Sequence, residues 1–557
     1  MDTATNYPRL LNWQSQFAAN QSGQLAFLGL VCIIMAYLWW SHNHWPLYTR
    51  LTIVAGVFIG ALVSGAGALI VGAFLVLGAL ITYWRAASVR QFPLPRWALL
   101  ALLALLVRLP GMGESLWYDE TFTVSLARLP LDRMFVAIQS DVHPPLWYMV
   151  EWLAGRVLGW SEIAVRTPAL LFGVLSVLLV YRLAKSIHQN ERAAFVAALI
   201  AALLPGALYY SNEARGYTLL VCAILGATIG LIENRKWLFA GALILAMYTH
   251  NLAFAYAGIL CVVALIQRGR SWAWALAGVA LAGAVWLPTL LYQAGDITDG
   301  FWITPLTPGA VFSPLFNMTV GGRMPETYIA LTSATIIALT LWSVRVSQTW
   351  IISSRGYVWI ALVVGVPFGV AVVSMWHNVY LDRALLPSIL MITVAWGYAL
   401  VEGYRGNAMV ARIAIMVALI MAVVPYWSHS NRADLRPLTR VCAGADAVFT
   451  TSVSMEMVAN YYRPVTTGGH TIPAIWSEAN DLNQWLSPSA KEALGWQQTT
   501  FERLPHGTVC LLDVDNALAR SDERQYVSNI LDQFKSTKRV LVDGGTFKLV
   551  AYMVQHG

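Results

Sequence analysis

Charged residues are scarce in this chain. Asp, Glu, Lys and Arg make up only 12% of its 557 residues, whereas 58% are hydrophobic, and the mean hydropathy is +0.58. Soluble globular domains carry about 25% charged residues. The composition therefore excludes a water-soluble protein and predicts a polytopic α-helical membrane protein.

Cysteine is also scarce, with 5 residues in the whole chain. Cys32, Cys222 and Cys261 lie in apolar segments and are interpreted as buried thiols. Cys442 and Cys510 share the only polar region, and they are able to pair if that region faces an oxidising compartment. Spacing alone leaves the pairing open.

Two kinds of motif are missing. We find no glycine-rich motif that would cradle the phosphates of a nucleotide, and residues 1–24 lack the basic, apolar and small-residue order of a cleavable signal peptide. The net charge of +7 comes mainly from single Lys and Arg residues in short loops between apolar runs, where they orient membrane helices. Nucleic acid is therefore not an expected partner.

Long apolar runs recur from Leu25 to about Tyr426. Most have roughly 15 to 22 residues, enough to cross ~30 Å of hydrocarbon, so we predict about 12 to 14 transmembrane helices. The run 51–84 fits either two short helices or one long tilted helix. The runs are 25–40, 51–84, 97–110, 167–184, 193–210, 217–233, 237–249, 252–267, 272–292, 327–344, 358–376, 384–402 and 408–426.

Basic residues fall in alternate loops, which the positive-inside rule assigns to the cytoplasm. The other loops, among them 111–166, 293–326 and 377–383, then face outward together with everything after 427. The predicted location is the cytoplasmic membrane, with an extracytoplasmic tail. The cytoplasmic residues are Arg85, Arg90, Arg96, Arg182, Lys185, Arg192, Arg235, Lys236, Arg268, Arg270, Arg345, Arg355, Arg405 and Arg412.

Three regions follow from these patterns. Residues 1–96 carry additional transmembrane helices, 97–426 form the main transmembrane region, and 427–557 form a small α/β domain. The first outer loop, 111–166, mixes apolar and polar residues as amphipathic helices on a membrane interface do. In the tail, helical patterns alternate with strand-like runs at 447–450, 509–514, 540–542 and 547–554.

The motif Trp117-Tyr118-Asp119-Glu120 lies just beyond an apolar run, so its carboxylates are expected near the lipid headgroups. A carboxylate near low dielectric has a raised pKa unless it is paired, which suits general-base chemistry. The plainer alternative is a salt bridge, for instance to Arg108 or Arg128, and for isolated acids it is the favoured one.

A second motif, Asp141-Val142-His143-Pro144-Pro145-Leu146, follows in the same loop. Its prolines bias His143 to an extended conformation at the start of the next helix. Asp141 also fits the N-cap of that helix, a role that is compatible with a functional site.

Further polar residues lie on the same predicted face. Glu213 and Arg215 fall between two apolar runs and are able to pair with each other, and His250 falls in the next outward turn, where a tight polar reversal is the ordinary explanation. Arg383 opens an apolar helix, where a charge is costly unless a phosphate or Asp382 pairs with it.

Together these segments resemble the GT-C superfamily of integral-membrane glycosyltransferases, in particular glycosyltransferase family 39, with its protein O-mannosyltransferases and lipid A aminoarabinose transferases. The resemblance covers roughly residues 97–426 and implies the GT-C fold. It rests on five motifs in order: Tyr118-Asp119-Glu120, Asp141-Val142-His143-Pro144-Pro145-Leu146, Ser211-Asn212-Glu213-Ala214-Arg215-Gly216-Tyr217, Tyr248-Thr249-His250 and Arg383-Ala384-Leu385-Leu386-Pro387.

The resemblance implies transfer of a sugar from a polyprenyl-phosphate-linked donor to a protein, lipid or glycan acceptor at the outer face, usually with inversion at the anomeric carbon. Asp119 corresponds to the catalytic aspartate that acts as general base, and Glu120 to the neighbouring acid that positions it. Arg383 corresponds to the arginine at the donor phosphate, with Arg215 as a second candidate. The predicted sugar and acceptor pocket comprises Tyr118, Asp141, His143, Glu213, Tyr217 and His250.

Some features depart from this pattern. Asp382 stands where relatives often have a small residue or proline, so Asp382 itself is able to hold Arg383. The Trp-Trp-Asp motif of an oligosaccharyltransferase is absent, which argues against en bloc transfer of a glycan. No cofactor is expected to be required, although Asp119, Glu120, Asp141 and His143 offer oxygen and imidazole donors for a divalent metal.

Two other functions are open. A lipid or sugar-lipid flippase would place charges and broken helices near the bilayer midplane, whereas here the ionisable residues gather at the outer surface. A catalytically inactive GT-C-like scaffold, with the tail binding a partner, is the second alternative.

Overall fold

A computed structural model describes residues 95–139, 143–296, 303, 306–319, 326–403, 434–437, 441–450, 453–462, 474–477, 492, 494, 497–504, 506–516, 521–543 and 547–556. The predicted transmembrane runs 25–40, 51–84 and 408–426 lie outside these residues, as does Asp141. The predicted count of 12 to 14 spans therefore stays a prediction.

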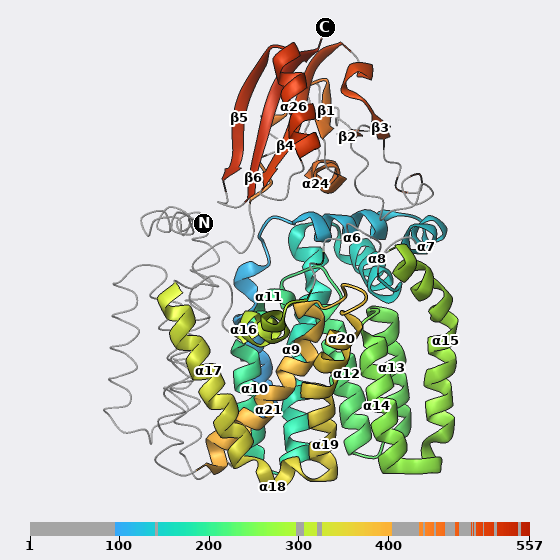
Figure 1. Cartoon of the computed structure of the whole chain (residues 1–557), viewed down its shortest axis with the longest axis vertical. Helices are drawn as coiled ribbons and strands as arrows, with labels where there is room; N and C mark the ends of the chain where they lie inside the picture. The colour runs from blue at the N-terminus through green and yellow to red at the C-terminus, as the bar shows by residue number, and fades with distance from the viewer. Residues whose placement is uncertain are drawn as a thin grey trace.

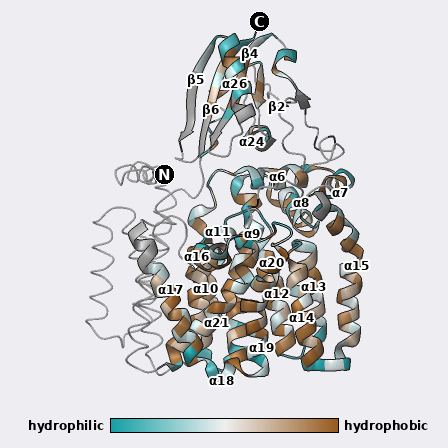
Figure 2. Ribbon diagram, viewed as in Figure 1, coloured by the Kyte–Doolittle hydropathy of each residue, from teal (hydrophilic) through white to brown (hydrophobic). Residues whose placement is uncertain are grey.

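The described part of residues 95–403 is a bundle of apolar helices (Figures 1 and 2). Within it, 4 helices are long and apolar enough to cross a membrane, or 5 if a bent pair is one span. This is a multi-pass membrane fold. Its main helices are α5 (Arg96–Leu106), α9 (Glu162–His188), α10 (Glu191–Leu203), α11 (Pro205–Ser211), α12 (Tyr217–Ile232), α13 (Lys236–Thr249), α14 (Ala253–Arg268), α15 (Ala273–Asp296), α17 (Glu326–Val346), α19 (Ser354–Ile360), α20 (Val366–Val373) and α21 (Leu386–Glu402).

Short elements join these helices. They are η4 (Gly269–Trp272), η5 (Pro308–Phe312), α16 (Ser313–Thr319), α18 (Gln348–Ile351) and η7 (Asp382–Leu385). Helix α18 lies at the lower end of the bundle in Figure 1. A π-helical turn, η6 (Ala361–Gly365), connects α19 to α20. The last predicted motif, 383–387, spans η7 and the start of α21.

Helix α21 occupies the interior, because 89% of an 18-residue stretch of the span Asp382–Glu402 is buried, whereas only 17% of such a stretch in the span Ala253–Gln293, across α14 and α15, is buried. The exposed apolar side chains of α15, such as Leu281 and Val285, suit contact with lipid rather than protein. Arg383 lies in η7, at the start of this interior helix.

The bent pair α10–α11 changes direction by 60° at Leu204 and Pro205. Proline fits the first position of α11, where its missing N–H costs nothing. The fully buried Arg108 holds this break: its Nη1 donates to the carbonyl of Ala202 at 3.0 Å and its Nε donates to Ser211 Oγ at 2.9 Å. Arg108 is thus used inside the bundle. The acidic motif does form salt bridges, the plainer alternative for its carboxylates, and these are made with Arg166 and Arg383.

The predicted cytoplasmic loops meet at one end of the bundle. Arg182 Nη2 lies 2.6 Å from Glu233 Oε2, and Arg355 Nη1 donates to the carbonyl of Ile187 at 3.1 Å. The first outer loop lies at the opposite end (Figure 1). Which end faces the cytoplasm remains a prediction.

The first outer loop forms η3 (Leu109–Gly111), α6 (Tyr118–Arg128), α7 (Leu131–Gln139) and α8 (Leu146–Leu158), which lie across the end of the bundle (Figure 1). Helix α7 buries Met134 and Ile138 and exposes Leu131 and Phe135. The amphipathic pattern thus folds into short helices with one face on the protein.

The tail contains a six-stranded sheet in the order β3-β2-β1-β4-β6-β5. Strand β1 pairs in parallel with β2 and β4, and β6 pairs antiparallel with β4 and β5. All four strand-like runs fall in strands. The elements are β1 (Ala447–Thr450), α24 (Val453–Tyr462), β2 (Ala474–Ser477), β3 (Gln497–Thr499), η9 (Phe501–Arg503), β4 (Gly507–Asn516), α26 (Ser521–Gln533), β5 (Ser536–Asp543) and β6 (Phe547–His556).

Cys442 and Cys510 form a disulfide in this domain. It joins the segment before β1 to β4, and it lies in a buried cluster with Met455 and Val458 of α24. The pairing that spacing left open is therefore made, and one face of α24 belongs to the core of the tail domain.

Candidate active site

Asp119 and Arg383 form an ion pair at the end of the bundle that α6 covers, with Arg383 Nη1 3.3 Å from Asp119 Oδ2. Their side chains are only 13% and 14% exposed, so the pair is shielded from most of the solvent. Asp119 stands in the first turn of α6, where the helix N-terminus favours a negative charge. The pair brings the first and last predicted motifs into contact.

Asp382 does not hold Arg383. Its Oδ1 accepts from Ser313 Oγ at 2.6 Å, and its Oδ2 accepts from Asn317 Nδ2. Asp382 therefore ties η7 to α16, and the predicted alternative of an Asp382–Arg383 pair is wrong.

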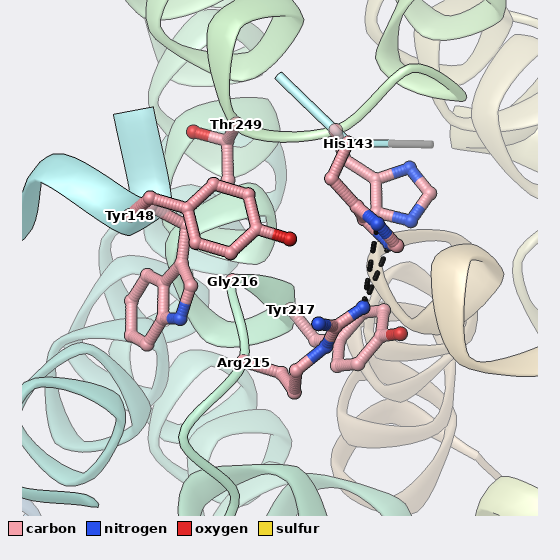
Figure 3. A pocket seen from close by; sticks show the side chains of 8 residues that line it. His143, Tyr148, Arg215, Gly216, Tyr217 and Thr249 are labelled. Carbon is pink, nitrogen blue, oxygen red and sulfur yellow. Dashed lines mark hydrogen bonds between the residues drawn. The ribbon is translucent and has the colours of Figure 1, made fainter. Parts of the chain in front are cut away.

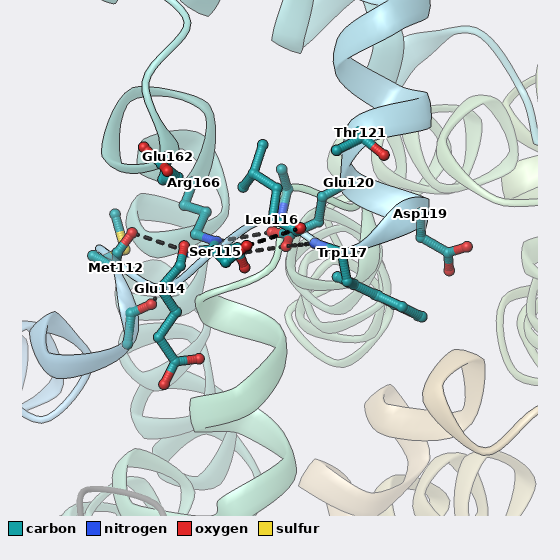
Figure 4. Close-up of polar contacts among 12 residues, drawn as sticks. Met112, Glu114, Ser115, Leu116, Trp117, Asp119, Glu120, Thr121, Glu162 and Arg166 are labelled. Atoms are coloured by element: carbon teal, nitrogen blue, oxygen red, sulfur yellow. Dashed lines mark hydrogen bonds and ion pairs between the residues drawn. The ribbon is translucent and has the colours of Figure 1, made fainter. Parts of the chain in front are cut away.

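Glu120 lies in a different environment from its neighbour (Figure 4). It is fully buried and paired with Arg166 of α9, with Nη2 to Oε2 at 2.7 Å and Nε to Oε1 at 2.8 Å. Its oxygens also accept the backbone N–H groups of Ala214 at 2.9 Å and Trp117 at 3.3 Å. Glu120 is thus fully engaged in holding α6, while Asp119 points away from this cluster.

Arg166 also donates to backbone carbonyls of the segment before α6: Met112 and Ser115 at 3.1 and 3.0 Å, and Glu114. The sequence analysis did not identify this residue. Its position directly before the apolar run 167–184 was the available signal of a buried arginine. A buried arginine needs a carboxylate or carbonyl groups as partners.

Arg215 and His143 are the next pair (Figure 3). Arg215 Nη2 lies 3.0 Å from His143 Nε2, and Arg215 Nη1 donates to Thr123 Oγ1 of α6 at 3.1 Å. A guanidinium can only donate hydrogen bonds, so in this contact the facing imidazole nitrogen of His143 is the acceptor. Thr123 is a second site residue that the sequence analysis missed.

His250 lies across from His143, with ring centroids 5.3 Å apart in an edge-to-face arrangement. Burial lowers the pKa of His250 well below its ordinary value, and the neighbouring His143, Arg215 and Arg383 lower it further. His250 Nδ1 accepts from the backbone N–H of Leu252 at 3.1 Å. The neutral ring therefore carries its proton on Nε2, which is buried and has no hydrogen-bond partner among the described residues.

These side chains line one small pocket (Figure 3). Its walls come from α8, the segment before α12, and the turn after α13, and Arg383 stands over the ring of Tyr217 with its guanidinium carbon 5.5 Å from the centroid. The pocket thus has the cation of Arg215 in its wall and that of Arg383 beside Tyr217, together with a buried N–H donor on His250 and aromatic rings. Its lining residues are His143, Trp147, Tyr148, Arg215, Gly216, Tyr217, Thr249 and His250.

The remaining predicted residues lie close by or outside the description. Tyr118 begins α6 beside Asp119 and is 40% exposed. Glu213 is fully buried before α12, and its charge, like that of Asp119, acts on Arg383. Asp141 lies outside the described residues, and within them no three His, Cys, Asp or Glu side chains gather as metal ligands.

Comparison with known proteins tests the predicted resemblance. A family model described as dolichyl-phosphate-mannose-protein mannosyltransferase matches residues 142–292. The crystal structure of ArnT from Cupriavidus metallidurans bound to undecaprenyl phosphate matches with 12% identity and a TM-score of 0.53, covering 82% of this chain and 97% of that one. Its apo form matches over the same shares, with 13% identity and a TM-score of 0.52. The resemblance to GT-C glycosyltransferases is confirmed.

The family match includes His143, Arg215 and His250 but neither Asp119 nor Arg383. The GT-C fold match extends over most of the chain, and at this identity it shows the fold alone. No curated protein sequence matches the chain.

Proposed function

We propose that this protein is a membrane glycosyltransferase that moves a sugar from a polyprenyl-phosphate-linked donor to a protein, lipid or glycan acceptor at the extracytoplasmic face. The observation that carries the proposal is the shielded contact of Asp119 with Arg383 beside a second arginine, Arg215. The ArnT fold supports it, because one ArnT structure is bound to undecaprenyl phosphate. A base beside a cationic cluster suits transfer from a phosphate leaving group.

In the proposed reaction, Asp119 removes the proton from the acceptor hydroxyl. The acceptor oxygen then bonds to the anomeric carbon, and the bond from that carbon to the phosphate oxygen breaks with its electrons left on the phosphate. Arg383 binds this phosphate and stabilises its developing charge, with Arg215 as the second cation. Attack opposite the leaving group inverts the anomeric carbon, so the sugar separates Asp119 from Arg383 during transfer.

The other residues shape the pocket. The Nε2–H of His250 is a buried donor, and the rings of His143 and Tyr217 lie 5.3 and 5.8 Å from the His250 ring. A sugar hydroxyl bound in this pocket would satisfy the donor. Tyr118, Tyr217 and Glu213 bound the sugar and acceptor pocket, Asp141 is proposed for the same pocket from its motif, and Glu120 positions α6 through Arg166. No metal is required in this scheme.

The extracytoplasmic location of the site follows from the same proposal. The sheet domain lies at the same end of the molecule as α6 (Figure 1), and its Cys442–Cys510 disulfide suits an oxidising compartment. The chain would then sit in the cytoplasmic membrane with residues 97–426 as its catalytic transmembrane region.

The proposal is tested with purified protein in nanodiscs and a labelled polyprenyl-phospho-sugar. Wild type is expected to release polyprenyl phosphate and to transfer the sugar to acceptor or water, and Asp119→Asn to lose about 10²- to 10⁴-fold in rate. Turnover that survives Asp119→Asn would contradict the role of Asp119. Translocation of the lipid without sugar transfer would favour a flippase, and neither activity would favour an inactive scaffold.

A further inference from the structure

The tail domain contacts the helix that carries Asp119. Helix α24 packs directly on α6, and Met457 joins a buried cluster with Phe122 and Leu126 of α6 and Tyr148 of α8. The opposite face of α24 lies in the tail core beside the disulfide. One helix is therefore shared between the domain core and the outer surface of α6.

Three polar contacts of this interface lie on the residues just before α6, and Tyr462 also donates to Glu162 Oε1 of α9 at 3.4 Å. The hydroxyl of Tyr462 accepts from the backbone N–H of Leu116 at 2.8 Å and lies 3.0 Å from Ser115 Oγ. Ser115 Oγ in turn accepts from the N–H of Leu435 at 3.1 Å. Leu116 is fully buried, so its N–H has little access to water if the tyrosine hydroxyl is removed.

This segment is held from two sides. From the membrane side, Arg166 donates to the carbonyl of Ser115 at 3.0 Å and pairs with Glu120. From the outer side, Tyr462 holds the N–H of Leu116. Only Trp117 and Tyr118 separate this point from Asp119, so the two contacts together set where the first turn of α6 begins.

We propose that Tyr462 of the tail domain is a positioning residue for Asp119, so that the tail domain is part of the active-site framework. This inference rests on the proposed function for its effect on rate, but its structural part does not. Tyr462 acts through the backbone of Leu116, and it takes no part in proton transfer or in binding of the phosphate.

The chain offers a matched control on the same helix. The hydroxyl of Tyr461 donates to the carbonyl of Trp160 at 2.7 Å, and its ring lies under Arg128. Tyr461→Phe thus removes the same atom from the same interface, but its lost partner lies between α8 and α9 rather than before α6. Any general weakening of domain contact would affect both variants.

The test compares Tyr462→Phe and Tyr461→Phe in the full chain in nanodiscs. Tyr462→Phe leaves a buried N–H without its acceptor, so kcat for sugar transfer is expected to fall about tenfold with an unchanged KM for the polyprenyl-phospho-sugar. Tyr461→Phe is expected to keep kcat within about twofold of wild type. Equal kcat values in the two variants would overturn the proposal.

A second measurement needs no activity. Backbone hydrogen exchange at residues 116–121, without any substrate, is expected to be about tenfold faster in Tyr462→Phe than in wild type or Tyr461→Phe. Unchanged exchange would overturn the proposal whatever the kinetics. Faster exchange in a protein whose wild type transfers no sugar would support the positioning by Tyr462 and refute the proposed transferase function.

Discussion

The guanidinium of Arg383 contacts the carboxylate of Asp119 at the end of the helix bundle that α6 covers, with Nη1 3.3 Å from Oδ2. Arg383 precedes the deeply buried α21, and Asp119 lies in the first turn of α6 in the loop 111–166. This contact therefore joins the bundle to the loop that covers it. In the proposed reaction the two groups act on opposite sides of the anomeric carbon. A substrate that enters between them would exchange one ion pair for another.

The first prediction concerns the shape of the cation at position 383. Arg383→Lys keeps the positive charge but loses the planar fork that binds two phosphate oxygens at once. We expect the KM for a polyprenyl-phospho-sugar to rise about tenfold or more. Initial-rate kinetics in nanodiscs measures this change.

A matched control is Arg235→Lys, at the opposite end of the bundle, where the Arg235 side chain is 60% exposed and pairs with Glu233 at 3.2 Å. This variant is expected to behave like wild type. Wild-type kinetics in Arg383→Lys would show that Arg383 serves only to hold Asp119, for which a lysine suffices.

The second prediction concerns the buried pair of Glu120 and Arg166, both of whose side chains are 0% exposed. Glu120→Ala leaves a buried guanidinium without its carboxylate, which is expected to cost about 3 kcal/mol or more in stability. Loss of folded protein on heating in detergent is the measurement. The surface pair of Arg182 and Glu233 provides the comparison, since Glu233→Ala should cost about 1 kcal/mol or less. Equal losses in the two variants would contradict the structural role of Glu120.

Much of the architecture could be predicted because membrane helices and strands leave periodic patterns. The apolar run 167–184 lies within α9, and the strand-like run 509–514 lies within β4. The motifs also identified Asp119 and Arg383 as members of one site. Local pattern alone does not predict that Asp119 and Arg383 pair with each other, because the choice of partner depends on how distant elements pack.

Arg166 and Tyr462 illustrate this limit. Arg166 lies in a sequence that reads as the start of an apolar helix, yet its side chain turns back to bind Glu120 and the carbonyls before α6. Tyr462 lies 346 positions after Leu116 in the sequence. Its contact with Leu116 arises only from the docking of α24 on α6.

The third prediction is a dependence of stability on pH through Glu151 of α8. This side chain is fully buried, and neither carboxylate oxygen has a hydrogen-bond partner among the described residues. Burial raises the pKa of Glu151 well above its ordinary value, and the charge of Glu120 raises it further. The folded state therefore keeps a proton that the unfolded state releases above about pH 4.3. Folding stability is lost as the pH rises from that value toward the folded pKa.

Glu151→Gln removes this titration while keeping the side-chain shape. The variant is expected to be more stable than wild type at pH 8 by an amount that shrinks toward pH 5, measured as the unfolding midpoint at both values. Asp132→Asn on the exposed side of α7 is the control and should leave the difference between the two pH values unchanged. A wild-type advantage that is larger at pH 8 would mean that Glu151 is ionised and paired in the folded protein.

The last prediction uses the disulfide to test the side of the membrane on which the site lies. If the tail is extracytoplasmic, Cys442 and Cys510 should resist alkylation in protein that is purified without reductant and then denatured, because they are bonded to each other. The free thiols of Cys222 and Cys261 should be alkylated under the same conditions. Mass spectrometry of the peptides distinguishes these states, and a sample that is reduced before alkylation shows that all the cysteines are reachable. Alkylation of Cys442 and Cys510 without reductant would place the tail in a reducing compartment, and because α24 of the tail packs on α6, it would move the proposed site to that side as well.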